Sequence, residues 1–415
     1  MNEEPPSRVS WGQLACLTIF ALAFGIVINT VDPGVLGRKA VELTPDRKNT
    51  VLGLLTFAGL VLAMIWQPMV GSLSDRTRSP LGRRSPYWIG GALGVLLALA
   101  WLGAARTLVG LFAGICLLQL ALNTIQAPWQ ALLPEQVPPA QHGAAAGFKS
   151  AFEILGFVVG RYLGGWLVAQ GRVTAALCIA GSCILVALAI TLRASRAGAA
   201  TPSLRSDSSL WPLQRPPGFA AWFGNRILVW GGFILLSTFL LFYAMDVFGL
   251  PEPDAQRLVA RLSLAIGAAL LVVTIPAGWL SDRFGRLPLL AAAGTLAAAG
   301  TGLILLSRTL SGVLAAALIL GLGIGIFLSS SWALLIDLVP PASAGRYLGV
   351  ANIATAGGSA LARLLGGLLI DPLNHWLGDA ASGYRIVYVL ALLAFVVGTL
   401  LLLAFRNARV AMAGA

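Results

Sequence analysis

A row of amide side chains is the clearest group of residues in this sequence that could bind a solute. Gln119, Asn123, Gln126 and Gln130 follow one another at intervals of four, three and four residues. On an α-helix this spacing places all four on one face. Because an amide both donates and accepts hydrogen bonds, the row suits a hydroxyl-rich or amide-bearing solute. Amides also hydrogen-bond neighbouring helices within a membrane, so a structural role is the alternative.

The next apolar stretch contains an acid between two bases, in the order Lys149, Glu153 and Arg161. Glu153 is the only acid that we place well inside a membrane span, where a charged carboxylate must be neutralised or paired. Lys149 is one helical turn earlier and is the natural partner, while Arg161 is two turns later and is a poorer one. We expect Glu153 either to exchange a coupling proton or hold a cation, or to form a fixed ion pair with Lys149.

Arginines stand shortly before a glycine pair in matching parts of the chain, at Arg161 and Arg363. They either bind an anionic substrate or brace an interface. Near Arg161, glycines recur at every fourth position, at Gly156, Gly160 and Gly164. Small residues at this spacing let helices approach closely, which suits a moving interface between two halves of the protein.

Aromatic and hydroxyl side chains could add contacts to a sugar-like ligand. Tyr243 offers a ring for stacking, and Ser330 lies in a run of three serines. Trp129 and Trp332 stand near the ends of apolar stretches, so we expect them to be anchors at the membrane interface.

A charged string occurs twice, as GSLSDRTRSPLGRR at 71–84 and as GWLSDRFGR at 278–286. The two Asp-Arg pairs are 207 residues apart, and acids at the ends of later apolar stretches recur 202 residues apart. Each half thus offers one acid to one basic cluster. We expect these contacts to gate the cytoplasmic side; the alternative is that the arginines only follow the positive-inside rule. The residues assigned to this gate are Asp75, Arg76, Arg83, Arg84, Glu135, Asp282, Arg283, Arg286 and Asp337.

A second gate is expected on the outer side. Asp32 and Asp246 are placed at corresponding positions, where the first and seventh helices are expected to end. They either form an outer gate or simply terminate these helices in water.

The composition determines which elements position these residues. The 415-residue chain is 58% hydrophobic and 11% charged, whereas about a quarter of the residues in soluble proteins are charged, so lipid must be its solvent. The apolar runs predict an all-α integral membrane protein, because a bilayer crossing needs about 20 helical residues. The twelve predicted transmembrane helices are 11–31, 50–70, 86–104, 107–132, 142–170, 173–191, 225–245, 257–280, 287–306, 310–336, 345–370 and 384–405.

The segment 193–224 is rich in Arg, Ser and Pro, so it is the expected cytoplasmic linker between an N-terminal bundle at 1–192 and a C-terminal bundle at 225–415. More Lys and Arg fall on the side of the two termini, which predicts that both termini are cytoplasmic and that the protein is in the inner (plasma) membrane.

Several classes of function are excluded. The net charge of +12 is spread over connections between apolar runs, so nucleic acid is not an expected partner. All four cysteines fall in apolar runs, which indicates no disulfide framework. The sequence has no recognisable nucleophile, metal-ligand set or phosphate loop, so we expect neither an enzyme nor a metal or cofactor. A proton or a monovalent cation is the only expected coupling partner.

These features resemble the major facilitator superfamily across the whole chain. The string at 278–286 is similar to the loop signature of that family between helices eight and nine. The first copy is lengthened by the segment 77–81, and with Gln67-Pro68 before it and Ser85-Pro86-Tyr87 after it, it resembles the sucrose-type and glycoside-pentoside-hexuronide cation symporters.

The resemblance implies two pseudo-symmetric six-helix bundles that carry a small polar solute by alternating access. It favours a sugar-like solute, coupling to a proton or cation, and a protein that functions as a monomer among membrane lipids. The alternatives are efflux of drugs or metabolites by the same fold, and a non-transporting membrane receptor or assembly factor.

Overall fold

The computed structural model describes residues 9–138, 141–196, 217–338 and 344–413. Regular structure in these ranges is helical throughout, and no strand occurs in them. Twelve helical segments are long and apolar enough to cross a membrane. The predicted all-α membrane protein with twelve transmembrane helices is therefore confirmed.

The chain forms two compact units. Unit 1 comprises Met1–Leu43 and Ala58–Asp207, and unit 2 comprises Thr44–Phe57 and Ser208–Ala415. Of the expected linker, residues 197–216 lie outside the described part of the chain. The short segment Thr44–Phe57 differs from the sequence-based division, because it lies in the N-terminal part of the chain but belongs to unit 2.

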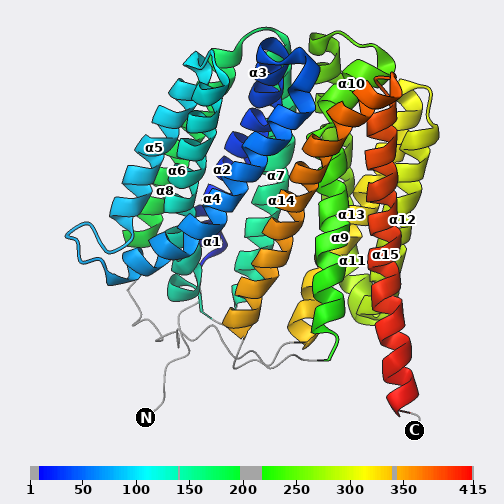
Figure 1. The fold of residues 1–415 in the computed structure, drawn as a ribbon. Helices are drawn as coiled ribbons and strands as arrows, with labels where there is room; N and C mark the ends of the chain where they lie inside the picture. The colour runs from blue at the N-terminus through cyan, green and yellow to red at the C-terminus, as the bar shows by residue number, and fades with distance from the viewer. Residues whose placement is uncertain (1–8, 139–140, 197–216, 339–343, 414–415) are drawn as a thin grey trace. The chain divides into compact units, whose positions relative to one another are not determined.

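The helices of unit 1 run from blue to green in Figure 1. They are α1 (Trp11–Thr18), α2 (Phe20–Asn29), η1 (Thr30–Val35), α3 (Leu36–Leu43), α4 (Lys48–Arg76), α5 (Ser85–Ala104), α6 (Leu108–Gln136), α7 (His142–Ala169) and α8 (Val173–Arg196). A short turn of helix before α4, η2 (Pro45–Arg47), belongs to unit 2. The first part of α4 lies in unit 2 and the rest lies in unit 1.

The first membrane helix does not end at Asp32. The backbone of Asp32 is non-helical (φ −116°, ψ 117°), but the chain continues through η1 and α3 to Leu43. Asp32 is buried at this break rather than at a helix end in water. The expected outer loop with its basic residues is helical instead: Arg38 pairs with Glu42, and Lys39 donates to the carbonyl oxygen of Ala105 at 2.9 Å.

Close glycine packing joins α2 to α7 within unit 1. A Cβ atom added at Gly25 would lie 2.8 Å from Cα of Gly156, and one added at Gly160 would lie 2.7 Å from the carbonyl oxygen of Ile26. A Cβ at Gly164 would similarly approach Thr30. These glycines therefore let two helices of the same unit touch, and the expectation that they form an interface between the halves is wrong.

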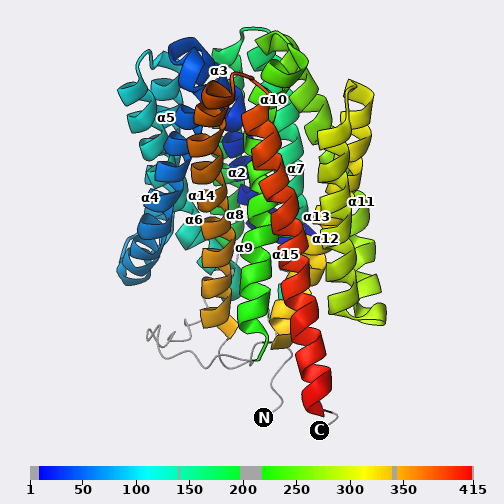
Figure 2. The same cartoon turned by 45° about the vertical axis from the view of Figure 1, so that its right-hand side comes forward.

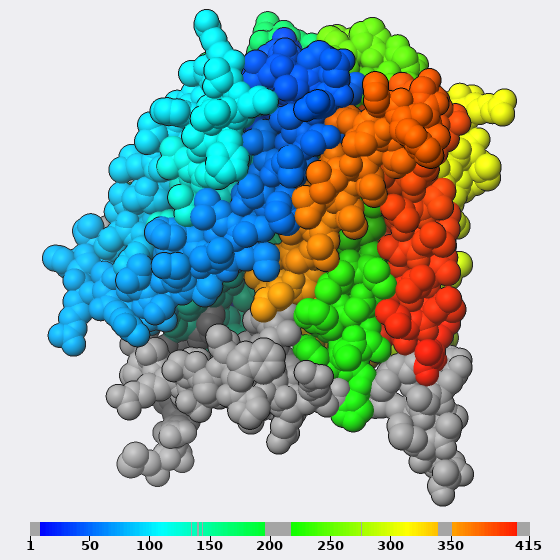
Figure 3. Space-filling model, in the orientation of Figure 1, coloured from blue at the N-terminus to red at the C-terminus, as the bar shows by residue number. Residues whose placement is uncertain are grey.

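The helices of unit 2 continue the colour sequence from green to red in Figures 1 and 2. They are α9 (Phe219–Thr238), α10 (Leu240–Phe248), α11 (Glu252–Phe284), α12 (Arg286–Leu306), α13 (Leu310–Leu338), α14 (Ala344–Leu377) and α15 (Ser382–Ala413). Helix α9 packs beside α14 and α15, and in Figure 3 its visible part lies between them. The seventh membrane helix begins six residues earlier than predicted, at Phe219, and it is interrupted at Phe239 between α9 and α10.

Local sequence signals explain several helix boundaries. Thr107 caps α6 by accepting a hydrogen bond from the backbone N–H of Gly110 at 3.1 Å. Gly285 separates α11 from α12 with φ of 91°, a conformation that glycine adopts without steric cost. Before α15, Asp379 accepts hydrogen bonds from the backbone N–H of Ala381 and the hydroxyl of Ser382, which hold the pKa of its carboxyl below the ordinary value.

Candidate functional site

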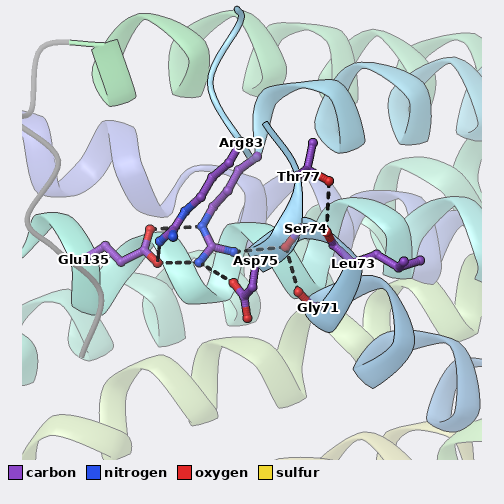
Figure 4. A network of polar contacts seen from close by, with 8 residues as sticks. Gly71, Leu73, Ser74, Asp75, Thr77, Arg83 and Glu135 are labelled. Atoms are coloured by element: carbon purple, nitrogen blue, oxygen red, sulfur yellow. Dashed lines mark hydrogen bonds and ion pairs between the residues drawn. The ribbon is translucent and has the colours of Figure 1, made fainter. Parts of the chain in front are cut away.

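The first charged string forms a network between the end of α4, the start of α5 and the end of α6 (Figure 4). Arg84 precedes α5, and its Nε donates to Glu135 at 3.0 Å. Its Nη2 donates to Asp75 at 3.1 Å, and its Nη1 donates to the hydroxyl of Ser74 at 3.2 Å. Arg83 also pairs with Glu135. Arg84 is buried, so one guanidinium connects three helix ends of unit 1.

Unit 2 repeats this network with one arginine. The Nε of Arg286 donates to Asp337 at 3.0 Å, and its Nη1 donates to the hydroxyl of Ser281 at 3.0 Å. Arg286 also forms an ion pair with Asp282. It therefore connects the end of α11, the start of α12 and the end of α13 in the way that Arg84 does in unit 1.

The insertion in the first string leaves the network unchanged. Ser74 and Asp75 precede their counterparts in unit 2 by 207 residues, whereas Arg84 and Glu135 precede theirs by 202. The difference is the five residues Thr77–Leu81, which the loop before α5 accommodates. The pairing of each acid with the basic cluster of its own half is as predicted, and the gating role remains a prediction.

Arg76 and Arg283, which directly follow Asp75 and Asp282, make different contacts from the other arginines of the two strings. Arg283 lies over the rings of Trp279 and Phe284, with centroid distances of 5.8 and 5.6 Å. Within the described ranges, neither Arg76 nor Arg283 pairs with an acid. The contacts of the two strings therefore depend on Arg83, Arg84 and Arg286.

Two members of the amide row on α6 form hydrogen bonds within unit 1. Asn123 is buried, and its Nδ2 donates to the carbonyl oxygen of Gln119 at 2.8 Å. Gln130 accepts a hydrogen bond from Gln67 of α4 at 3.3 Å. Gln119, Gln126 and Gln130 are half-buried. The Asn123 side chain is therefore bonded to its own helix, whereas the three glutamines are partly exposed, and their role in solute binding remains a prediction.

Glu153 forms the predicted ion pair with Lys149 on α7, with 2.6 Å between Nζ and Oε1. Its side chain is 46% exposed within unit 1, although α7 is a membrane-spanning segment. Arg161 lies apart from this pair: it is buried, contacts the ring of Phe157, and its Nε donates to Asn29 of α2 at 3.4 Å. The structure thus brings together Lys149 and Glu153 but not Arg161. In unit 2, Arg363 is half-buried on α14.

Tyr243 and Ser330 lie inside unit 2 rather than at a solute-accessible surface. Tyr243 stacks on Tyr388 with 4.8 Å between ring centroids, and Tyr384 packs against it edge-on. Both Tyr243 and Ser330 are buried. In this packing neither side chain presents exposed surface to a solute, and their assignment to substrate binding remains a prediction.

The two tryptophans expected at the membrane interface differ from each other. Trp129 is buried, donates to the carbonyl oxygen of Leu17 at 2.7 Å and packs edge-on against Phe20 and Phe24. Its expected role as an interfacial anchor is therefore wrong, because the ring is a packing element between α1, α2 and α6. Trp332 is exposed at the surface of unit 2.

Asp246 belongs to a polar cluster in unit 2, which we call the α4 anchor: Lys48, Asn49, Asp246, Asp371 and Tyr384. Lys48 donates to Asp246 at 2.5 Å, and the hydroxyl of Tyr384 donates to the same carboxylate at 2.6 Å. Asn49 donates to Asp371 at 2.7 Å and to Tyr384 at 2.8 Å. The cluster holds the start of α4 against α10, α14 and α15.

Asp32 does not share this arrangement. It lies at the break of the first membrane helix, whereas Asp246 lies seven residues beyond the break at Phe239. The expectation that the two acids occupy corresponding positions is therefore wrong. Sequence inspection finds Asp246 but not its partners, because they are brought together from segments more than 130 residues apart.

A buried arginine, Arg226, is the most important residue that the sequence analysis does not select. It belongs to α9, and its buried guanidinium donates to Thr355 of α14 and Ser331 of α13. With the seventh helix predicted to start at 225, Arg226 is indistinguishable from the basic residues that flank many membrane helices. The observed start at Phe219 places it two turns inside the helix.

Comparisons with known proteins agree with this architecture. The sequence profile of the Major Facilitator Superfamily matches residues 14–363. Sucrose transport protein SUC4 from Arabidopsis thaliana is 28% identical over 135 residues, which cover 27% of this chain and 26% of that protein. Sucrose transport protein SUT4 from Oryza sativa subsp. indica is 25% identical over 171 residues, covering 35% of this chain and 28% of that protein. The chain thus matches about a quarter of the length of these relatives.

Solved structures are similar over nearly the whole chain. A bacterial homologue of the human lysosomal transporter Spinster has a TM-score of 0.72 at 16% identity, with 96% of each chain covered. The nucleoside transporter NupG has a TM-score of 0.71 at 14% identity, with 95% of this chain and 98% of that chain covered. At these identities the likeness shows the fold. From the family match over most of its length, this chain belongs to the major facilitator superfamily.

Proposed function

We propose that this protein is a secondary active transporter that carries a small polar solute, with a sugar-like solute favoured, by alternating access. The observation that carries the proposal is the Lys149–Glu153 ion pair, which places a titratable carboxylate within a membrane-spanning helix. A charge in such a segment is costly, so it is retained where protonation or ion binding is part of the cycle.

The solute class is inferred from the amides and from the relatives. The half-buried Gln119, Gln126 and Gln130 can donate to and accept from hydroxyl groups. Two of the similar proteins are sucrose transport proteins, and the charged string with its five-residue insertion resembles the same branch. A proton or a monovalent cation is the proposed coupling ion, with Glu153 as its site.

The proposed setting is the plasma membrane, with both termini in the cytoplasm and the monomer as the functional form. The two charged strings and their acids then lie on the cytoplasmic side. There they would close and release the path for the solute, each within its own unit.

Uptake by proteoliposomes tests the proposal. Purified protein is reconstituted, and influx of labelled sucrose, glucose, glucuronate, a nucleoside and a cationic drug is followed with and without an imposed pH gradient. We expect at least one sugar-like solute to accumulate above its external concentration only when the gradient is present. Flux of the drug alone would replace the proposal with efflux, and absence of flux and of counterflow for the whole panel would favour a receptor or assembly factor.

A further inference from the structure

Arg226 carries a positive charge into the interior of unit 2. It is 2% exposed within the membrane-spanning helix α9. Its Nε donates to the hydroxyl of Thr355 at 3.1 Å, and its Nη1 donates to the hydroxyl of Ser331 at 3.2 Å. No carboxylate of the described residues forms an ion pair with it. Its partners in unit 2 are therefore neutral.

The polar contacts of α9 with α14 fix the position of this guanidinium. One turn after Arg226, the indole N–H of Trp230 donates to the hydroxyl of Ser359 at 2.9 Å. Thr355 and Ser359 each donate their own hydrogen to a carbonyl of α14, so their oxygens are free to accept from α9. A guanidinium has five N–H donors, and among the described residues Thr355 and Ser331 each accept from one of those of Arg226.

The charge of Arg226 lies close to the surface of unit 2, next to the exposed ring of Trp332. Its Cζ is 4.9 Å from the ring centroid of Trp332 and 5.5 Å from that of Phe327. Trp332 is 36% exposed, and on α14 Asn352 is exposed beside the half-buried Thr355. Polar residues on a membrane-spanning segment line a cavity or pair within the bundle rather than face lipid. The exposed ring of Trp332 therefore lies next to the guanidinium of Arg226 and separates it from the surface.

Packing alone does not require this charge. In unit 1, the corresponding contact between the first membrane helix and α6 is made by the indole of Trp129, which donates to Leu17 among the rings of Phe20 and Phe24. In unit 2, the indole of Trp222 makes a similar bond to the carbonyl oxygen of Ser331 at 2.7 Å. The tryptophan that joins the two helices is on α6 in unit 1 and on α9 in unit 2, and in unit 2 Arg226 of α9 adds a second bond to α13.

The energetic consequence concerns what neutralises Arg226. A buried cation loses its hydration free energy, and contacts with hydroxyl groups and aromatic faces compensate for only part of this loss. An oxyanion would compensate for more of this loss, because carboxylate and phosphate oxygens carry the opposite charge and accept paired hydrogen bonds from the guanidinium. The remaining N–H donors of Arg226 are suited to a carboxylate or phosphate group.

The geometry points to Arg226 as the anchor of a binding subsite for a solute that bears an oxyanion, such as a sugar acid or a sugar phosphate. This inference rests on the proposed function and specifies its solute: the sugar-like molecule carries a negative group, which Arg226 binds while Trp332 lies beside it. The subsite belongs to unit 2, whereas the amide row and Glu153 belong to unit 1.

Thermal unfolding of the purified full-length protein tests the subsite. The midpoint is measured with D-glucuronate, glucose 6-phosphate, inorganic phosphate and D-glucose, with sodium chloride added to equal ionic strength. We expect an oxyanion to raise the midpoint by several degrees, since a ligand that binds only the folded state stabilises it. Arg226→Gln should weaken the apparent affinity for that anion at least tenfold, Arg226→Lys should weaken it less, and the exposed control Arg257→Gln should leave it unchanged. A response to glucuronate but not to phosphate identifies a carboxylate subsite, and the reverse identifies a phosphate subsite.

A second measurement needs no variant. Phenylglyoxal modifies arginines when they become accessible, and mass spectrometry follows the modification of Arg226 over time. An accessible subsite requires Arg226 to be modified without anion, so the absence of any modification would refute it. We expect the stabilising anion to protect Arg226 and glucose to give no protection. If glucose stabilises the wild type and Arg226→Gln equally while no oxyanion does, the subsite is refuted and the proposed transport of a sugar-like solute stands. If an oxyanion stabilises the protein but Arg226→Gln binds it as well as the wild type does, the anion binds elsewhere and the inference is also refuted.

Discussion

Glu135 accepts hydrogen bonds from Arg84 across 51 residues of sequence, and Asp337 accepts from Arg286 across the same separation in the other unit. The two pairs differ in how far they are removed from solvent. The Arg84 and Glu135 side chains are 6% and 19% exposed, whereas those of Arg286 and Asp337 are 22% and 50% exposed. The Arg84–Glu135 pair of unit 1 is therefore more buried than the Arg286–Asp337 pair of unit 2.

This difference predicts unequal costs for removing the two acids. Glu135→Gln removes the carboxylate that Arg83 and the buried Arg84 share, and leaves Arg84 with the exposed Asp75. Breaking a buried pair costs about 3–5 kcal/mol, and the exposed Asp75 offsets only a small part of this. Asp337→Asn removes a half-exposed partner, which is worth about 0–1 kcal/mol, and Arg286 keeps Asp282. Thermal unfolding in detergent should show a large drop in the midpoint for Glu135→Gln and a small one for Asp337→Asn. Equal drops would show that burial does not set the strength of these contacts.

The coupling role of Glu153 can be tested against a matched ion pair. Arg38–Glu42 and Lys149–Glu153 are both spaced by four residues at 2.8 and 2.6 Å, and their acids are both 46% exposed. We expect Glu153→Gln to abolish gradient-driven accumulation and to leave counterflow of labelled solute intact, because only the ion-linked step is lost. Glu42→Gln should retain both activities. Accumulation that persists in Glu153→Gln would remove this carboxyl from the coupling mechanism.

The glycine contacts between α2 and α7 predict a position-specific effect of one methyl group. A Cβ at Gly156 would lie 2.6 Å from the carbonyl oxygen of Leu22, whereas one at Gly147 on the same helix would meet nothing within 4 Å. Gly156→Ala should therefore cost about 1–3 kcal/mol by separating the helices. Gly147→Ala should be neutral or stabilising by up to about 1 kcal/mol, because alanine favours the helix. The unfolding midpoints of the two variants measure this contrast, and a neutral Gly156→Ala would contradict the close approach.

The α4 anchor predicts a strong effect of Asp246. Asp246→Asn leaves the amine of Lys48, whose side chain is only 12% exposed, without its carboxylate partner. We expect a loss of about 3–5 kcal/mol, the range for breaking a buried pair. Asp254→Asn is the control in the same unit, because its pair with Arg257 is half-exposed and should contribute about 0–1 kcal/mol. A midpoint for Asp246→Asn that matches the control would show that the start of α4 is held by the other contacts of the anchor alone.

The sequence alone predicts the fold and the contacts that depend on near neighbours. Hydropathy and the repeated string identify the twelve helices, because each span is recognisable from its own residues. The Lys149–Glu153 pair is predictable because helix geometry places residues four apart on one face. The pairing of Glu135 and Asp337 follows from the repeat, which presents the same acid to the same basic cluster twice.

Burial and long-range pairing are less accessible from the sequence. Trp129 stands near the end of an apolar run, yet the rings of Phe20 and Phe24 enclose it, and only the packed helices show this. Arg226 is misjudged because the helix boundary is displaced by six residues, which changes a flanking charge into a buried one. Lys48 is separated from Asp246 by 198 residues, so no local pattern connects them.

The five extra residues Thr77–Leu81 also bear on the history of the protein. One string gained them or the other lost them, and yet serine, aspartate, arginine and the distant acid make the same contacts in both units. A shared arrangement of four side chains is more simply inherited once than acquired twice. Duplication of a six-helix unit that already had this arrangement accounts for the shared contacts with a single change in loop length.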